Sequence, residues 1–138
     1  MEANSGVSPQ IKKIIKQRDK AMSGDLSFNV TSKGTAPSAG TGFSAIDFEI
    51  TLEDSAGNVQ DWFNKTITMT ALAVTTVGDG VATQSPATTC VMKNGVGTVS
   101  VTGTATWASG DTFTVEVASA TILGYTVSSA NLLITCSA

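Results

Sequence analysis

Hydrophobic and polar residues alternate with a period of two along much of this 138-residue chain. The clearest run is IDFEITLE at residues 46–53, in which large apolar side chains alternate with acids and threonine. Because successive side chains on a strand point to opposite faces, this run predicts a strand with one buried and one solvated face. Residues 26–31 and 113–117 show the same alternation and predict two further strands.

Short clusters of turn-forming residues separate these runs from several weaker ones. Asn94-Gly95 is the strongest of them, because this dipeptide favours the two-residue turn of a β-hairpin. Residues 65–75 change phase part-way, which predicts a bulge or a corner, and residues 32–42 (SKGTAPSAGTG) predict a flexible loop. After the hairpin, the buried face of the next strand is expected to carry Val99, Val101, Ala105 and Trp107.

Short strands at a spacing of roughly 8–12 residues are typical of a β-sandwich. We therefore predict an all-β, immunoglobulin-like β-sandwich of about seven to nine strands. Charged residues make up only 14% of the chain, below the roughly 25% usual in soluble domains. Thr, Val and Gly are abundant instead, as expected for strands joined by tight loops. The sandwich is expected at residues 25–138, behind an N-terminal arm of residues 1–24.

The arm has a pattern of its own. Ile11, Ile14 and Ile15 have the spacing of one helical face, and Ser8-Pro9 is typical of a helix start. The segment is expected either to form a helix of about three to four turns or to lie extended on a partner. The residues expected to make this contact are Ile11, Lys12, Lys13, Ile14, Ile15, Lys16, Arg18 and Lys20.

Charge separates the arm from the rest of the chain. Residues 1–20 hold five basic and two acidic residues, a net charge of +3, whereas residues 21–138 hold three lysines and nine acids, a net charge of −6. A basic arm on an acidic body indicates a negatively charged partner, although a merely solvated tail is the alternative. We expect no nucleic acid, because no aromatic residues interleave with the lysines, and no membrane, because three isoleucines are too few. A protein surface with a shallow apolar groove fits both the lysines and the isoleucines.

The sequence offers little for catalysis. It contains no histidine, which removes the usual general base and the commonest metal ligand. No glycine-rich phosphate loop follows a predicted strand, and the acids at 47, 49 and 53 share the wet face of one strand, where carboxylates serve solubility. We therefore expect no enzymatic activity, no metal and no cofactor.

Cys90 and Cys136 allow three interpretations. They are buried thiols that pack as small apolar side chains, or they form a disulfide within the chain, or they link neighbouring subunits. A disulfide within the chain would close a loop of about 46 residues and stabilise the fold by about 4 kcal/mol on the loop-entropy model. Two thiols without a histidine do not make a zinc site.

Two segments resemble the bacterial immunoglobulin-like domains found in adhesins and in phage virion proteins. The first is ITLEDSAGNV at residues 50–59, and the second is VMKNGVGTVSV at 91–101 followed by GDTFTVEV at 110–117. The resemblance covers residues 44–136 and implies a fold without a specific function.

The chain departs from this family after Asn58, where Trp62 and Phe63 follow in place of the usual Pro-Val and a small residue. Neighbouring aromatic residues on a strand point to opposite faces, so one is expected in the core and the other over a loop. Alternatively, Trp62 or Phe63 anchors a contact with another chain, as aromatic side chains often do at interface centres.

A single such domain behind a short Lys-, Ile- and Arg-bearing segment resembles the head-decoration and head-fibre proteins of tailed phages. The resemblance implies a non-enzymatic structural protein that docks on the major capsid protein and decorates or cements the capsid. It also implies synthesis in the host cytoplasm and a place on the virion. Self-association on the capsid surface is a further expectation, because a single sandwich with an exposed edge often pairs with a neighbour. Two alternatives stay open, namely an adhesion or carbohydrate-binding module with Trp62 as the contact, and a tail or baseplate component.

Overall fold

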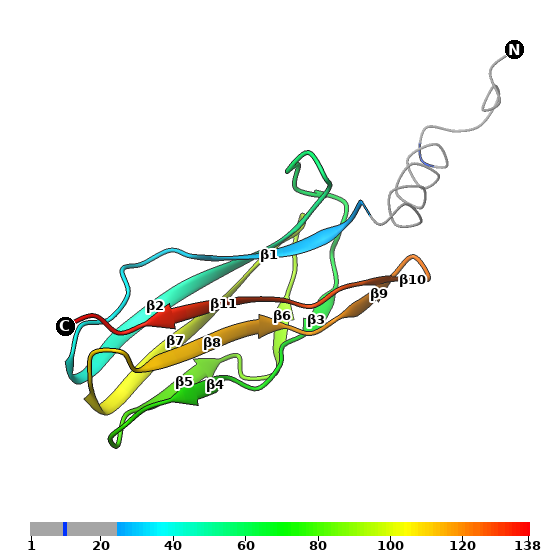
Figure 1. Ribbon diagram of the computed structural model, residues 1–138. Helices are drawn as coiled ribbons and strands as arrows, with labels where there is room; N and C mark the ends of the chain where they lie inside the picture. Colours follow the sequence, from blue (N-terminus) through cyan, green and yellow to red (C-terminus); the bar gives the residue numbers. More distant parts are fainter. Residues whose placement is uncertain (1–9, 11–24) are drawn as a thin grey trace, which may run out of the picture.

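The computed structural model of the chain describes Gln10 and residues 25–138. Apart from Gln10, the predicted arm lies outside the described residues, so its helical or extended form and its contact residues stay predictions. Residues 25–138 form an elongated all-β domain whose strands run mainly along its length, and the all-β prediction is confirmed (Figure 1).

Two antiparallel sheets make up most of the domain. The first has the order β1-β2-β7-β5, with β1 (Ser27–Ser32), β2 (Gly40–Glu53), β7 (Val96–Trp107) and β5 (Val81–Ser85). The second has the order β11-β8-β4, with β11 (Ala130–Thr135), β8 (Thr112–Val117) and β4 (Ala73–Thr75). Two short ladders pair β3 (Thr66–Thr68) with β6 (Thr89–Val91) and β9 (Ala120–Ile122) with β10 (Tyr125–Val127). These eleven strands exceed the expected seven to nine because five of them have only three residues.

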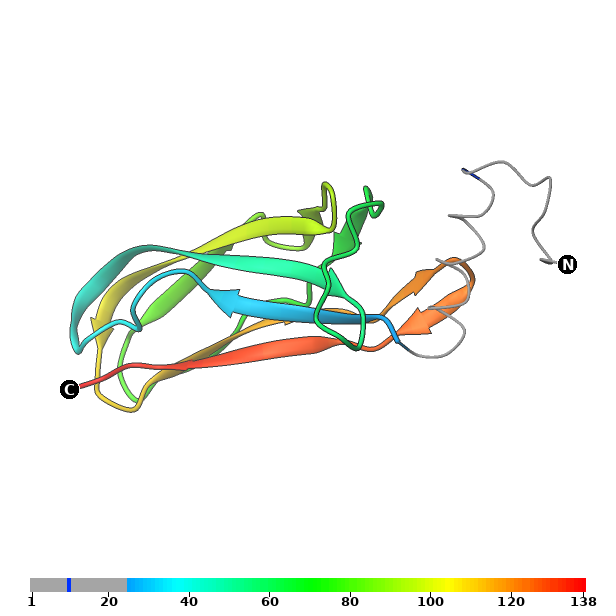
Figure 2. The same cartoon turned by 90° about the horizontal axis from the view of Figure 1, so that it is seen from above.

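One hydrophobic core joins the two larger sheets. The alternating residues of β2 and β8 point inward as predicted, and Phe48, Ile50 and Val115 have no exposed surface. The ring of Phe113 on β8 lies 5.9 Å from that of Phe48 on β2, edge to face. This shared core is consistent with a β-sandwich, and the strands of both layers can be followed from above in Figure 2.

The middle of the β2–β7 ladder is irregular. The register shifts between Thr41 and Phe43 and again between Phe43 and Ile46. Ala105 adopts a φ of 60° beside these shifts and is only half-buried, so its predicted place in the core is not realised. Gly103 is buried instead, and a Cβ at this glycine would overlap the ring of Phe43.

Residues 32–42, which the sequence predicts as a flexible loop, include the end of β1 and the start of β2, and the segment between them is held by hydrogen bonds. Pro37 is buried, and its carbonyl accepts a 2.9 Å hydrogen bond from the backbone N–H of Ser137. The Ala39 N–H donates in turn to the Ser137 carbonyl at 2.9 Å, and Ser38 and Ser137 form a parallel bridge. The segment therefore fastens the end of the chain to the connection between β1 and β2.

The phase change in residues 65–75 marks the predicted corner. Thr66–Thr68 pair with β6, whereas Ala73–Thr75 pair with β8 of the second sheet. Met69 between them bridges Val117.

The buried carboxylate of Asp111 ties three segments together. Its two oxygens accept hydrogen bonds from the backbone N–H groups of Val77 (3.0 Å) and Ala108 (2.8 Å). The backbone carbonyl of Asp111 accepts a third hydrogen bond, from the Cys136 N–H at 2.7 Å. Asp111 thus connects the β4–β5 link, the β7–β8 turn and the end of β11.

Replacing Asp111 by alanine removes the buried carboxylate that accepts two part-buried backbone hydrogen bonds, so we expect the free energy of unfolding to fall by about 3 kcal/mol. Asp79 is the matched control, because it is exposed and accepts a single backbone N–H, that of Thr106. Asp79→Ala should cost about 1 kcal/mol. Urea unfolding of both variants measures the difference, and equal losses would contradict this role of Asp111.

Candidate functional site

Trp62 and Phe63 lie in and just after a turn rather than on a strand. Phe63 is only 3% exposed and belongs to the core, so it is not available as the predicted partner anchor. Trp62 is half-buried, packs edge to face on Phe63 at 6.0 Å, and donates its indole N–H to Gln60 Oε1 at 3.0 Å. Only part of the Trp62 ring is left to meet another molecule, which fits the simpler interpretation of one core residue and one loop cover.

The loop that holds these aromatics is fastened to the Asn94-Gly95 hairpin. The Gly95 N–H donates to the Phe63 carbonyl at 2.9 Å, and the Asn94 N–H donates to Asn64 Oδ1 at 2.9 Å. Asn94 and Gly95 have φ of 52° and 79°, and Lys93 pairs with Val96, which confirms the predicted two-residue hairpin. The hairpin therefore sets the position of the whole loop.

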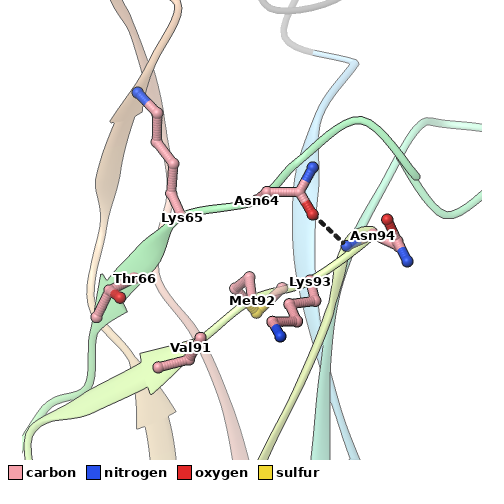
Figure 3. A pocket seen from close by; sticks show the side chains of 7 residues that line it. All are labelled: Asn64, Lys65, Thr66, Val91, Met92, Lys93 and Asn94. Carbon is pink, nitrogen blue, oxygen red and sulfur yellow. Dashed lines mark hydrogen bonds between the residues drawn. The ribbon is translucent and has the colours of Figure 1, made fainter.

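A shallow depression of about 290 Å³ lies between the two segments (Figure 3). Lys65, just before β3, and Lys93, just after β6, come from its two sides. Met92 is buried at this place, whereas Val91 is 59% exposed. The complete lining is Asn64, Lys65, Thr66, Val91, Met92, Lys93 and Asn94.

The depression is a patch of positive charge on an acidic domain. Lys65 and Lys93 are two of the three lysines after residue 20, and both are exposed. Within the described residues neither forms an ion pair, whereas the third, Lys33, lies 3.6 Å from a carboxylate oxygen of Glu49. The lining of the depression thus offers ammonium, amide and hydroxyl groups, with which it can bind carboxylates of a partner.

This depression lies at the end of the domain where the arm begins. Ser27, at the start of β1, pairs with Glu53, and Glu53 bridges Val59 in the loop before Trp62. Figure 1 places the C-terminus at the opposite end. Lys65 and Lys93 therefore lie at the end of the described domain from which β1 starts, together with Glu53, Asp54 and Asp61. The sequence alone does not indicate that Lys65 and Lys93 line the same depression, because only the β3–β6 ladder brings them there.

The two cysteines are free, buried and far apart. Cys90 pairs with Ile67 beyond the Met69–Val117 bridge, whereas the N–H of Cys136 bonds to Asp111. The length of β8 separates the two places, about 20 Å at 3.3 Å per residue, and a disulfide needs Cα atoms within about 7 Å. The structure thus favours the interpretation as buried thiols over a disulfide within the chain. Burial raises the pKa of both thiols, and the Asp111 carboxylate raises the pKa of Cys136 further.

No protein-family model, no curated protein and no solved structure matches this chain. In the part of the chain that the structure describes, no three His, Cys, Asp or Glu side chains are grouped as a metal site would require. The described residues contain no helix that is long and apolar enough to cross a membrane.

Gly95 should be the more sensitive of two glycines that both have a positive φ. A Cβ at Gly95 would overlap the Gln60 carbonyl oxygen, whereas a Cβ at Gly57, with φ of 85°, meets nothing within 4 Å. We expect Gly57→Ala to cost about 1 kcal/mol from the backbone conformation alone and Gly95→Ala about 3 kcal/mol. Urea unfolding compares the two, and equal losses would mean that the hairpin does not press against the Gln60 loop.

Both thiols should resist a thiol reagent in the folded protein, because each is at most 2% exposed and its raised pKa lowers the thiolate fraction at pH 8. Two thiols per chain should react once the protein is unfolded in denaturant. Comparing the variants Cys90→Ala and Cys136→Ala with the wild type shows which thiol gives each part of the labelling. Rapid labelling of the native protein would contradict the burial, and fewer than two reactive thiols in denaturant would indicate a disulfide.

Proposed function

We propose that this chain is a non-enzymatic structural protein of a phage virion, which decorates or cements the capsid by docking on the major capsid protein. The observation that carries the proposal is the placement of positive charge. The arm holds five basic residues, and the depression adds Lys65 and Lys93, which form no ion pair within the described residues, at the end of the domain from which β1 starts. All of these charges can face one acidic protein surface.

The strand order supports the immunoglobulin-like assignment behind this proposal. Lettered in chain order, β1, β2, β4, β5, β7, β8 and β11 become strands A to G, and the two sheets then read A-B-E-D and G-F-C. These are the sheets of a constant-type immunoglobulin domain. The β3–β6 and β9–β10 ladders are then additions within the connections. The cysteines stand outside strands B and F, unlike those of antibody domains.

Docking through the arm follows from elementary energetics. Burying an isoleucine side chain in an apolar groove contributes about 1.5–3 kcal/mol, so Ile11, Ile14 and Ile15 can supply most of the affinity. The lysines and Arg18 speed the encounter and fix the register on a negative surface. The acidic outer face of β2 would be repelled by the same surface, which favours docking by the arm end.

Charge reversal in the arm tests the proposal with the full chain. Lys12→Glu, Lys13→Glu and Lys16→Glu together should lower occupancy on purified capsid particles at least about tenfold at 0.15 M salt, which corresponds to about 1.4 kcal/mol. The control is Lys33→Glu, which reverses a lysine that already neighbours Glu49. Particle-bound protein is measured after sedimentation.

Unchanged occupancy of the triple variant would overturn docking through the arm. Binding to tails in place of heads, seen by electron microscopy of labelled protein, would favour the tail or baseplate alternative. Binding to a glycan array that Trp62→Ala abolishes would favour the adhesion module.

A further inference from the structure

One long side of the domain ends in two strands without an outer neighbour. β5 pairs only with β7, and β4 pairs only with β8. Among the described residues, no backbone hydrogen bond outside the β5–β7 ladder reaches Val81–Ser85. On the opposite side the outer strands are β1 and β11, and there the segment from Pro37 to Ala39 is hydrogen-bonded to Ser137 and the charged Lys33 directly follows β1. β5 is therefore an open edge.

Within its five residues the open edge lacks the protection that edge strands usually carry, and Pro86 follows directly after its last residue. Such strands are normally guarded by charged side chains, proline or a bulge. β5 is VATQS, without a charge or a proline, and its five residues pair with β7 in unbroken register. Asp79 is the single charged residue between Lys65 and Lys93, and its carboxylate is engaged by the Thr106 N–H.

Exposed apolar side chains lie on the strands and turn beside this edge. Val77, in the turn between β4 and β5, is 88% exposed, and Val81, the first residue of β5, is 52% exposed. Val74 on β4 is 37% exposed. Burying these apolar side chains against another molecule removes them from water and therefore favours association with that molecule.

We propose that a second copy of this chain pairs with β5 in antiparallel fashion across a two-fold axis. The two four-stranded sheets then become one continuous sheet of eight strands. With the axis at Thr83, the two Thr83 residues lie opposite each other, and Val81 lies opposite Ser85 of the second copy. The Thr83–Thr83 and Val81–Ser85 pairs are favourable or neutral across the two strands. Because the axis is two-fold, the assembly is a closed dimer to which no third copy can add at β5.

The edge at β5 is also a place where two copies of this acidic domain can meet without repulsion. Two bodies of net charge −6 repel wherever their carboxylates meet, for example at the outer face of β2 with Asp47, Glu49 and Glu53. Across β5 the first neighbours are threonine, serine and valine, so the backbone groups can pair without bringing like charges together. The contact is short, so the dimer is weak in solution and increases with concentration. The inference stands independently of docking on a capsid.

Sedimentation equilibrium of the full chain over a range of concentrations tests the proposal. The mean mass should rise toward that of a dimer. Thr83→Lys places two like charges opposite each other and should weaken association at least about tenfold. Thr31→Lys is the matched control, since Thr31 is an exposed threonine on β1, at the other edge of the same sheet, and this variant should behave as the wild type.

Crosslinking gives a second readout that does not depend on weakening the contact. Thr83→Cys should form a disulfide-linked dimer with oxidised glutathione, because opposite residues of an antiparallel pair have Cα atoms about 4.5–5.5 Å apart. Thr31→Cys should not, and both native cysteines are buried. A wild-type chain that stays monomeric, an undiminished dimer in Thr83→Lys, or equal crosslinking at positions 31 and 83 would each overturn the proposal.

Discussion

The ring of Phe113 packs among three aromatic side chains of the facing sheet, at centroid distances of 5.6 Å to Phe43, 5.9 Å to Phe48 and 6.1 Å to Trp107. The two sheets are held together at this contact. Phe43 can lie there only because Gly103 has no side chain, and the register shifts of β2 against β7 stand on either side of Phe43. Just before Phe113, the Asp111 carboxylate fastens the neighbouring turns. The core and the irregular ladder therefore depend on each other.

Much of this fold follows from local patterns. The alternation in residues 46–53 and 113–117 gives the buried faces of β2 and β8, and Asn94-Gly95 gives the hairpin. What the patterns miss depends on distant partners. The Ser137 hydroxyl, for example, donates to the carbonyl of Pro37, 100 residues away in the chain, at 3.4 Å. Likewise, nothing in the local sequence indicates that Gly103 and not Ala105 is the buried residue, because that choice is made by the Phe43 ring.

Only the sign of the charge at the candidate site was predictable from the sequence. Charge counting separates a basic arm from an acidic body, but it does not indicate that Lys65 and Lys93 line one depression. On the outer face of β2 the acids are already engaged, Asp47 by the Ser100 hydroxyl and Glu49 by Lys33. The described surface thus has an acidic face on β2, an end where Lys65 and Lys93 stand near Glu53, Asp54 and Asp61, and an edge, β5, without charged side chains, and each suits a different neighbour. This division arises from strand order, which composition does not contain.

The opposite placement of the two ends of the domain gives it a direction. β7 alone has twelve residues, which spans about 40 Å. The arm enters beside Glu53, whereas Ser137 is fastened at the far end by Pro37 and Ala39. If the arm docks as proposed, a polypeptide fused after Ala138 would leave the domain about 40 Å from the docking surface. A fused cargo would then be displayed clear of that surface, with the domain as the spacer.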